Sequence, residues 1–159
     1  MEIDDLWVEA YQGEVLGEVL FTLLAERQND SDRRRALQAL ALLERATKEL
    51  AVPVLERRGI DAGDTETIVA EAAAMAGGVT ELPWSEFLGY FQPEISKFLE
   101  KYRRLAMLSN DGYEHEVAQT YVAHEQALET FLRRSLGEED GDPLEAIFAL
   151  PHVAAARSI

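Results

Sequence analysis

The stretch YQGEVLGEVLF, residues 11 to 21, places a carboxylate on the apolar side of a helix. At about 100° per residue, Glu14 lies within about 60° of a set of aromatic and small residues. These residues are Trp7, Ala10, Tyr11, Gly17, Phe21 and Ala25. A charge buried on such a face costs several kcal/mol unless something balances it. We therefore expect Glu14 to meet other polar groups inside a helical protein.

The composition is that of one soluble domain. The chain has 159 residues, of which 47% are hydrophobic, enough for a sizeable core. It has no cysteine, which excludes disulfides, thiolate metal sites and a cysteine nucleophile. The start, MEIDDLW, lacks the basic and apolar regions of a signal peptide, and no apolar run reaches the ~18 residues of a membrane span. We predict a cytoplasmic protein.

The formal net charge is −15, from 30 acidic and 15 basic residues. Such a field repels nucleic acid and anionic membranes, so we expect neither as a partner. The excess acid serves solubility in one interpretation. In the other, some carboxylates bind a cation, and those carboxylates must lie inside. No pattern in the sequence identifies a small-molecule substrate.

Four long helices are predicted, and almost no segment has the pattern of a strand. Their expected ranges are 4–27, 32–57, 84–108 and 113–136. Asp30 or Ser31 is a suitable cap for the second helix and Gly59 a suitable stop. Proline is expected to kink the second helix at Pro53, and to kink or split the third at Pro93.

A connecting segment, 60–83, joins the two helix pairs. A short helix is predicted in it over 67–76, capped by Asp64 or Thr65 and ended by Gly77–Gly78. Residues 1–137 are predicted to form one helical bundle that includes this segment. Residues 138–159 are predicted to form an acidic linker, a last short helix (PLEAIFAL) that starts near Pro143, and a tail that is either loose or docked.

Several polar residues face inward or lie at the edge of an apolar stripe. Glu44 lies near such an edge, where an ion pair with Lys48 one turn away is the simpler explanation. His124 is central to an apolar face, where a neutral, hydrogen-bonded histidine is the simpler explanation. Other carboxylates flank these faces, and solvent or helix-dipole positions explain them without a ligand role. They are Glu18, Glu94, Glu114, Glu116 and Glu125.

Three segments together resemble the ferritin-like, rubrerythrin-related superfamily. They are EAYQGEVLGEVLF (9–21), LLERATKEL (42–50) and YEHEVAQTYVAHEQALETFL (113–132). The resemblance implies an all-α four-helix bundle with a long crossover between the second and third helices. It also implies an internal iron or manganese site, and, if the protein is an enzyme, a di-iron or peroxide-type oxidoreductase.

The family site takes one Glu from each of two helices and a Glu-x-x-His from each of the other two. By resemblance, Glu14, Glu44, His124 and Glu94 match ligand positions, with Glu18 and Glu114 as weaker candidates. Thr47 and Tyr121 replace the expected His and Glu, and with Tyr11 they are expected beside the ligands. These replacements favour one divalent ion over two. A metal-free alternative has Tyr121 hydrogen-bonded to a buried carboxylate, or Glu14 protonated.

Two functions follow from this pattern. The first is a metal-binding ferritin-like protein that loses its metal when Glu14 is changed to Ala. The second is a metal-free interaction module, because the first helix has a second apolar face that the connecting helix or another subunit must cover. That face comprises Val8, Val15, Leu16, Val19 and Leu23. The second hypothesis predicts a homodimer. A classical hydrolase has no support in the sequence.

Overall fold

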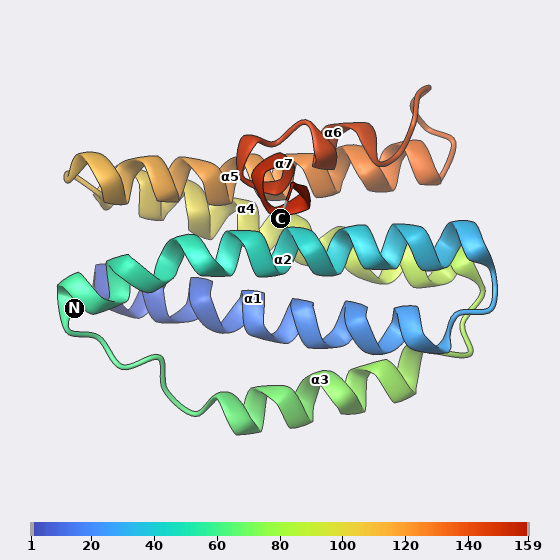
Figure 1. Ribbon diagram of the computed structural model, residues 1–159, viewed down its shortest axis with the longest axis horizontal. Coiled ribbons are helices and arrows are strands. Elements are labelled where there is room, and N and C mark those ends of the chain that lie inside the picture. The colour runs from blue at the N-terminus through green and yellow to red at the C-terminus, as the bar shows by residue number, and fades with distance from the viewer. Residues whose placement is uncertain (1, 159) are drawn as a thin grey trace. The chain divides into compact units, whose positions relative to one another are not determined.

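The computed structural model describes residues 2–158, and within that range it contains seven helices and no strand. The predicted all-helical class is confirmed, and α7 is a helix that the sequence analysis left as a tail. Figure 1 shows their arrangement. The helices are α1 (Glu2–Arg27), α2 (Ser31–Arg58), α3 (Thr65–Val79), α4 (Trp84–Leu108), α5 (Gly112–Ser135), α6 (Glu145–Phe148) and α7 (Pro151–Arg157). They fall into two compact units, with the division between Glu81 and Leu82.

In the first unit, α1 and α2 form an antiparallel hairpin (Figure 1). The side chain of Asp30 caps α2 by accepting a hydrogen bond from the backbone N–H of Arg33 at 2.9 Å. An ion pair between Arg58 and Asp4, at 2.7 Å, joins the far ends of the two helices. Helix α2 runs through Pro53 without interruption and stops at Gly59, whose φ of 64° suits glycine.

The connecting helix α3 packs along α1 in the same unit (Figure 1). Asp64 caps it, and Ala72 and Ala76 are fully buried. The predicted stop at Gly77–Gly78 is wrong, because the helix continues through both glycines to Val79. The sequence analysis expected the second apolar face of the first helix to pack against either the connecting helix or another subunit. The packing of α3 along α1 agrees with the first of these two alternatives.

In the second unit, α4 and α5 form another antiparallel hairpin. The rings of Tyr102 and Tyr121 meet edge to face, with centroids 4.9 Å apart. The imidazole Nδ1 of His115 lies 3.1 Å from the carbonyl oxygen of Ala106. Helix α4 has the predicted bounds and is not split at Pro93.

The C-terminal segment of the second unit is folded, not loose. Figure 1 shows α6 turned back along α5, and α7 follows it. The predicted last helix is confirmed in a shorter form, Glu145–Phe148. Ile147 and Val153 are fully buried, so both short helices contribute to the core. None of the helices within residues 2–158 has the length and apolar character that crossing a membrane requires.

Candidate metal centre

Helix α5 carries an imidazole and a carboxylate that are both buried. Asp111 fixes the start of the helix by accepting hydrogen bonds from the backbone N–H groups of Tyr113 and Glu114. In the middle of this helix, His124 has no exposed surface, and the next residue, Glu125, is only 4% exposed. Their closest polar atoms, His124 Nε2 and Glu125 Oε1, lie 3.8 Å apart. Two unlike metal-binding donors are thus held together in a water-poor part of the second unit.

A buried aromatic ring on the same helix lies one turn before this pair. Tyr121 is fully buried and precedes Glu125 by one turn. Its ring packs against Tyr102 of α4, which is also buried. Tyr121 therefore lies one turn before Glu125 in the buried part of the second unit, and its place beside metal ligands stays a prediction.

His152 of α7 belongs to the same electrostatic environment. Burial of the imidazole, and to a smaller extent repulsion between the charged forms of His152 and His124, together lower the pKa of His152 from 6.5 to about 4. Sequence reasoning placed His152 in a tail that is either loose or docked, and the structure places it in α7. Its segment lacks a long helical period, so only the return of the chain onto α5 reveals it.

In the first unit, the α1–α2 seam contains two buried carboxylates. Glu14 is 1% exposed and Glu44 is also buried. A Cβ added at Gly17 would lie 2.5 Å from Glu44 Cδ, 2.7 Å from its Oε1 and 2.9 Å from its Cγ. Gly17 therefore leaves the space that the Glu44 side chain fills. An ion pair between Glu44 and Lys48 was expected. The ammonium group of Lys48 instead pairs with the carboxylate of Glu18.

Thr47 is buried in the same stretch of α2. Its hydroxyl donates to the carbonyl oxygen of Leu43 at 2.9 Å. The register set by the Gly17–Glu44 and Asp4–Arg58 contacts places Thr47 opposite Glu14. Tyr11, predicted to lie beside the ligands, is half-buried one turn before Glu14.

The other predicted carboxylates lie in different surroundings. The Glu94 side chain is 47% exposed and pairs with Lys97 at 3.2 Å, as a surface carboxylate does. Glu18 is partly exposed and bound to Lys48. Glu114 and Glu125 were expected to face solvent, and this is wrong, because both are buried. Glu116 is exposed as expected.

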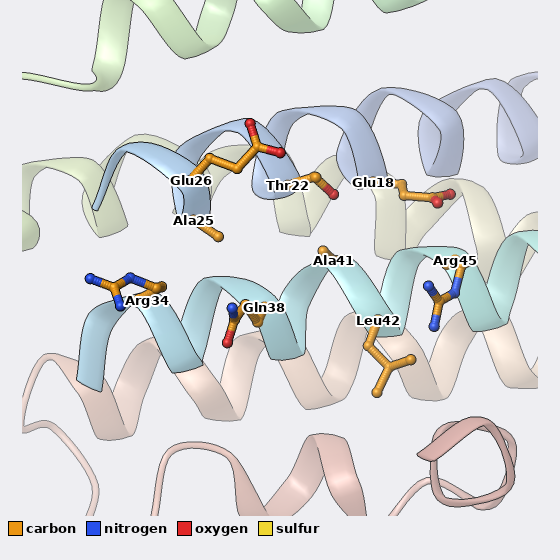
Figure 2. Close-up of a pocket in the computed structure, with 9 residues that line it drawn as sticks. All are labelled: Glu18, Thr22, Ala25, Glu26, Arg34, Gln38, Ala41, Leu42 and Arg45. Atoms are coloured by element: carbon orange, nitrogen blue, oxygen red, sulfur yellow. The ribbon is translucent and has the colours of Figure 1, made fainter. Parts of the chain in front are cut away.

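The first unit also has a groove between α1 and α2, lined by both charged and apolar side chains, with a volume of about 530 Å³. Figure 2 shows its lining, in which the carboxylates come from α1 and the guanidinium groups from α2. The charged residues are Glu18, Glu26, Arg34 and Arg45. Because both signs are present within it, the groove has no single charge that selects a ligand.

The predicted ligands are divided between the two units. Glu14 and Glu44 lie in the first, and His124 and Glu94 lie in the second. Their convergence on one ion stays a prediction. Within the second unit, the structure adds Glu125 to His124. Comparison with protein-family models, with curated proteins and with solved structures finds no match to this chain.

Proposed function

We propose that the protein binds a divalent transition-metal ion, with His124 and Glu125 among the ligands. The observation that carries the proposal is the burial of both side chains with Nε2 and Oε1 3.8 Å apart. Ligand atoms at about 2.1 Å from one ion, at near-tetrahedral angles, lie roughly 3.4 Å from one another. A small adjustment of the two side chains therefore suffices for both to bind the same ion.

The types of donor restrict the class of metal. Imidazole nitrogen with carboxylate oxygen suits Fe²⁺, Mn²⁺, Co²⁺ or Zn²⁺, whereas Ca²⁺ and Mg²⁺ prefer oxygen ligands alone. The chain contains no cysteine, so thiolate-dependent sites for soft metals do not arise. Of these metals, iron and manganese are the ones that the ferritin-like resemblance implies.

We further propose that the α1–α2 and α4–α5 hairpins associate as a ferritin-like four-helix bundle, and that Glu14 and Glu44 are also ligands. Two features support this proposal. Each hairpin consists of two long antiparallel helices, and each carries carboxylates with little exposure. Oxygen- or peroxide-dependent chemistry is the activity that such a site would support in this family.

Metal binding by matched variants tests the proposal. The protein is purified without chelator, its metal content is measured, and the metal-stripped form is titrated with Fe²⁺ (without oxygen), Mn²⁺ and Zn²⁺ by calorimetry. We expect His124→Gln and Glu125→Gln each to weaken metal binding at least tenfold. Changes to groups that only support metal ligands already lower metal affinity by about 10–100-fold. Glu14→Gln and Glu44→Gln test the ligands proposed from the first unit.

The same helix offers controls for both substitutions. His115 and Glu116 are exposed residues of α5, so His115→Gln and Glu116→Gln should bind metal as the unmodified chain does. Circular dichroism confirms that each variant is folded. The proposal fails if the unmodified protein binds none of the three ions, or if the α5 core variants bind as tightly as these controls.

Failure of the metal-binding proposal would favour the alternative function, a metal-free interaction module. Light scattering at micromolar concentration then distinguishes a homodimer from a monomer. Packing of α3 along α1 reduces the need for a second subunit on that helix, so the structure offers less support for a dimer than the sequence pattern alone.

A further inference from the structure

One aromatic ring of the chain lies on the surface. Tyr90 of α4 is 47% exposed, whereas every other aromatic side chain within residues 2–158 is buried or half-buried. Single exposed aliphatic residues are common on protein surfaces, but an exposed aromatic ring offers a flat face that can carry specific contacts. The groups around Tyr90 indicate what that face binds.

Neighbouring rings hold Tyr90 in place. Its ring meets that of Phe91 edge to face, with centroids 5.3 Å apart, and Phe91 meets Phe87 in the same way at 5.0 Å. Phe87 is only 4% exposed, so this row of rings is anchored in the interior of the second unit. A ring fixed in this way loses little conformational freedom when a partner covers it.

The helix surface beside Tyr90 is bare and offers a hydrogen-bond acceptor. Nothing lies within 4 Å of a Cβ added at the neighbouring Gly89, so no side chain covers that position. Pro93 follows Gly89 by one turn and has no N–H to donate to the carbonyl oxygen of Gly89. That oxygen therefore lacks its usual helical donor, and an N–H group from outside the chain can approach it.

Carboxylates flank the ring along the helix. Glu86 and Glu94 precede and follow Tyr90 by one turn, so all three lie along one face of α4. Residues 82–96 contain no lysine, arginine or histidine. Glu94, whose side chain is 47% exposed, pairs with Lys97, whereas the exposed Glu86 forms no ion pair with any residue in the described range. The surface around Tyr90 is therefore both aromatic and acidic.

We propose that this surface, formed by Glu86, Gly89, Tyr90 and Glu94, binds arginine side chains of a basic partner protein. A guanidinium group is planar, so it stacks on an aromatic ring and still donates N–H groups from its edge. The acceptors that it meets on α4 are the Glu86 carboxylate and the Gly89 carbonyl oxygen. The net charge of −15 attracts a basic partner over a longer range. This docking surface is independent of the proposed metal centre and goes beyond the proposed function.

An end-blocked, fluorescently labelled peptide tests the proposal. It carries two arginines separated by three glycines, because an extended chain then places them about 13–14 Å apart, close to the ~12 Å rise from Glu86 to Glu94. Fluorescence anisotropy measures the dissociation constant. We expect Glu86→Gln and Tyr90→Ala each to weaken binding about two- to fivefold, as the loss of an exposed ion pair or cation–π contact does. The same peptide with neutral citrulline in place of arginine should bind at least about fivefold more weakly.

Glu100→Gln is the matched control. Glu100 is an exposed carboxylate of the same helix, about 15 Å beyond Tyr90 along the axis. This variant changes the net charge as much as Glu86→Gln does, and it should bind the peptide as the unmodified chain does. A second measurement needs no variant, because the NMR amide signals of Glu86, Gly89 and Tyr90 should shift on addition of the peptide while that of Glu100 stays in place.

Two kinds of result would overturn the proposal. The first is that the unmodified chain does not bind the arginine peptide, or binds the citrulline form equally well. The second is that Glu86→Gln/Tyr90→Ala, shown to be folded by circular dichroism, binds the peptide as tightly as Glu100→Gln. In that case the overall negative charge alone attracts the peptide, and α4 has no arginine-binding surface at Tyr90.

Discussion

The most specific prediction concerns Gly17, whose missing side chain makes room for Glu44. In Gly17→Ala, the new Cβ would lie 2.5 to 2.9 Å from three atoms of the Glu44 side chain. These separations are far below the ordinary carbon–carbon contact of about 3.5–4.0 Å. Since Glu44 is buried, its side chain must swing into neighbouring packed atoms and its carboxyl group must leave its place.

The expected magnitude follows from two opposing effects. Replacing a helix-interior glycine by alanine stabilises a helix by about 0.5–1 kcal/mol when space is free. Overpacking a core costs about 1–3 kcal/mol, and the lower half applies here because a flexible side chain can yield. We therefore expect Gly17→Ala to destabilise the protein by roughly 0.75 kcal/mol, the middle of a range of about 0–1.5 kcal/mol.

Gly89→Ala is the matched control for this substitution. Gly89 also lies inside a helix, α4, but nothing lies within 4 Å of a Cβ added there. This variant should be stabilised by about 0.5–1 kcal/mol. Urea unfolding followed by circular dichroism measures both, and the opposite signs are the result to look for.

A double-mutant cycle identifies Glu44 as the cause. In a Glu44→Ala background the obstacle is absent, so adding Gly17→Ala should stabilise the protein as Gly89→Ala does. If Gly17→Ala is as stabilising as Gly89→Ala in the unmodified chain, Glu44 does not fill the space at Gly17 and the proposed geometry of the seam is wrong.

Three further predictions concern the second unit. Asp111→Ala removes the cap of α5 and should cost about 0.5–2 kcal/mol in urea unfolding, whereas the isosteric Asp111→Asn should cost less. The Arg134 guanidinium donates hydrogen bonds to Glu139, to the carbonyl oxygen of Asp142 and to Glu145. Arg134→Ala should therefore release the C-terminal segment, seen as faster amide hydrogen exchange in α6 and α7 with little change in α1 and α2. Exchange in α6 and α7 at the rate of the unmodified chain would contradict the role given to these hydrogen bonds. In the metal-free protein, His152 has a pKa of about 4 when folded and 6.5 as its ordinary value. The unfolded chain therefore binds more protons between these pH values, so stability is complete above about pH 6.5 and falls as the pH drops toward 4. Urea midpoints over this range should fall less for His152→Gln, and an equal fall would refute this contribution.

The helices could be predicted from the sequence because their ends carry local signals. Asp30, Asp64 and Asp111 each accept backbone hydrogen bonds at a helix start, and Gly59 ends α2 in the left-handed conformation. These effects need only neighbouring residues. The error at Gly77–Gly78 has a physical reason, since glycine permits a helix end without requiring one.

Burial of the site residues could be predicted only in part. The apolar stripe around Glu14 and His124 pointed both side chains inward, and both are buried. Glu125 lies on the flank of that stripe, where a periodic pattern favours solvent, and tertiary packing decides otherwise. The partial burial of His152 comes with the return of the chain along α5, where α6 contacts α5 and α7 contacts α6, and no local pattern reveals this packing.

Calorimetric titration of the metal-stripped protein with Fe²⁺, Mn²⁺ and Zn²⁺ is the most direct test of metal binding on α5. We expect about one ion per chain, in keeping with a single mixed nitrogen and oxygen site. The double variant His124→Gln/Glu125→Gln should lose this binding, while His115→Gln/Glu116→Gln should keep it. Absence of binding to the unmodified chain, or equal binding by both double variants, would contradict a metal centre at His124 and Glu125.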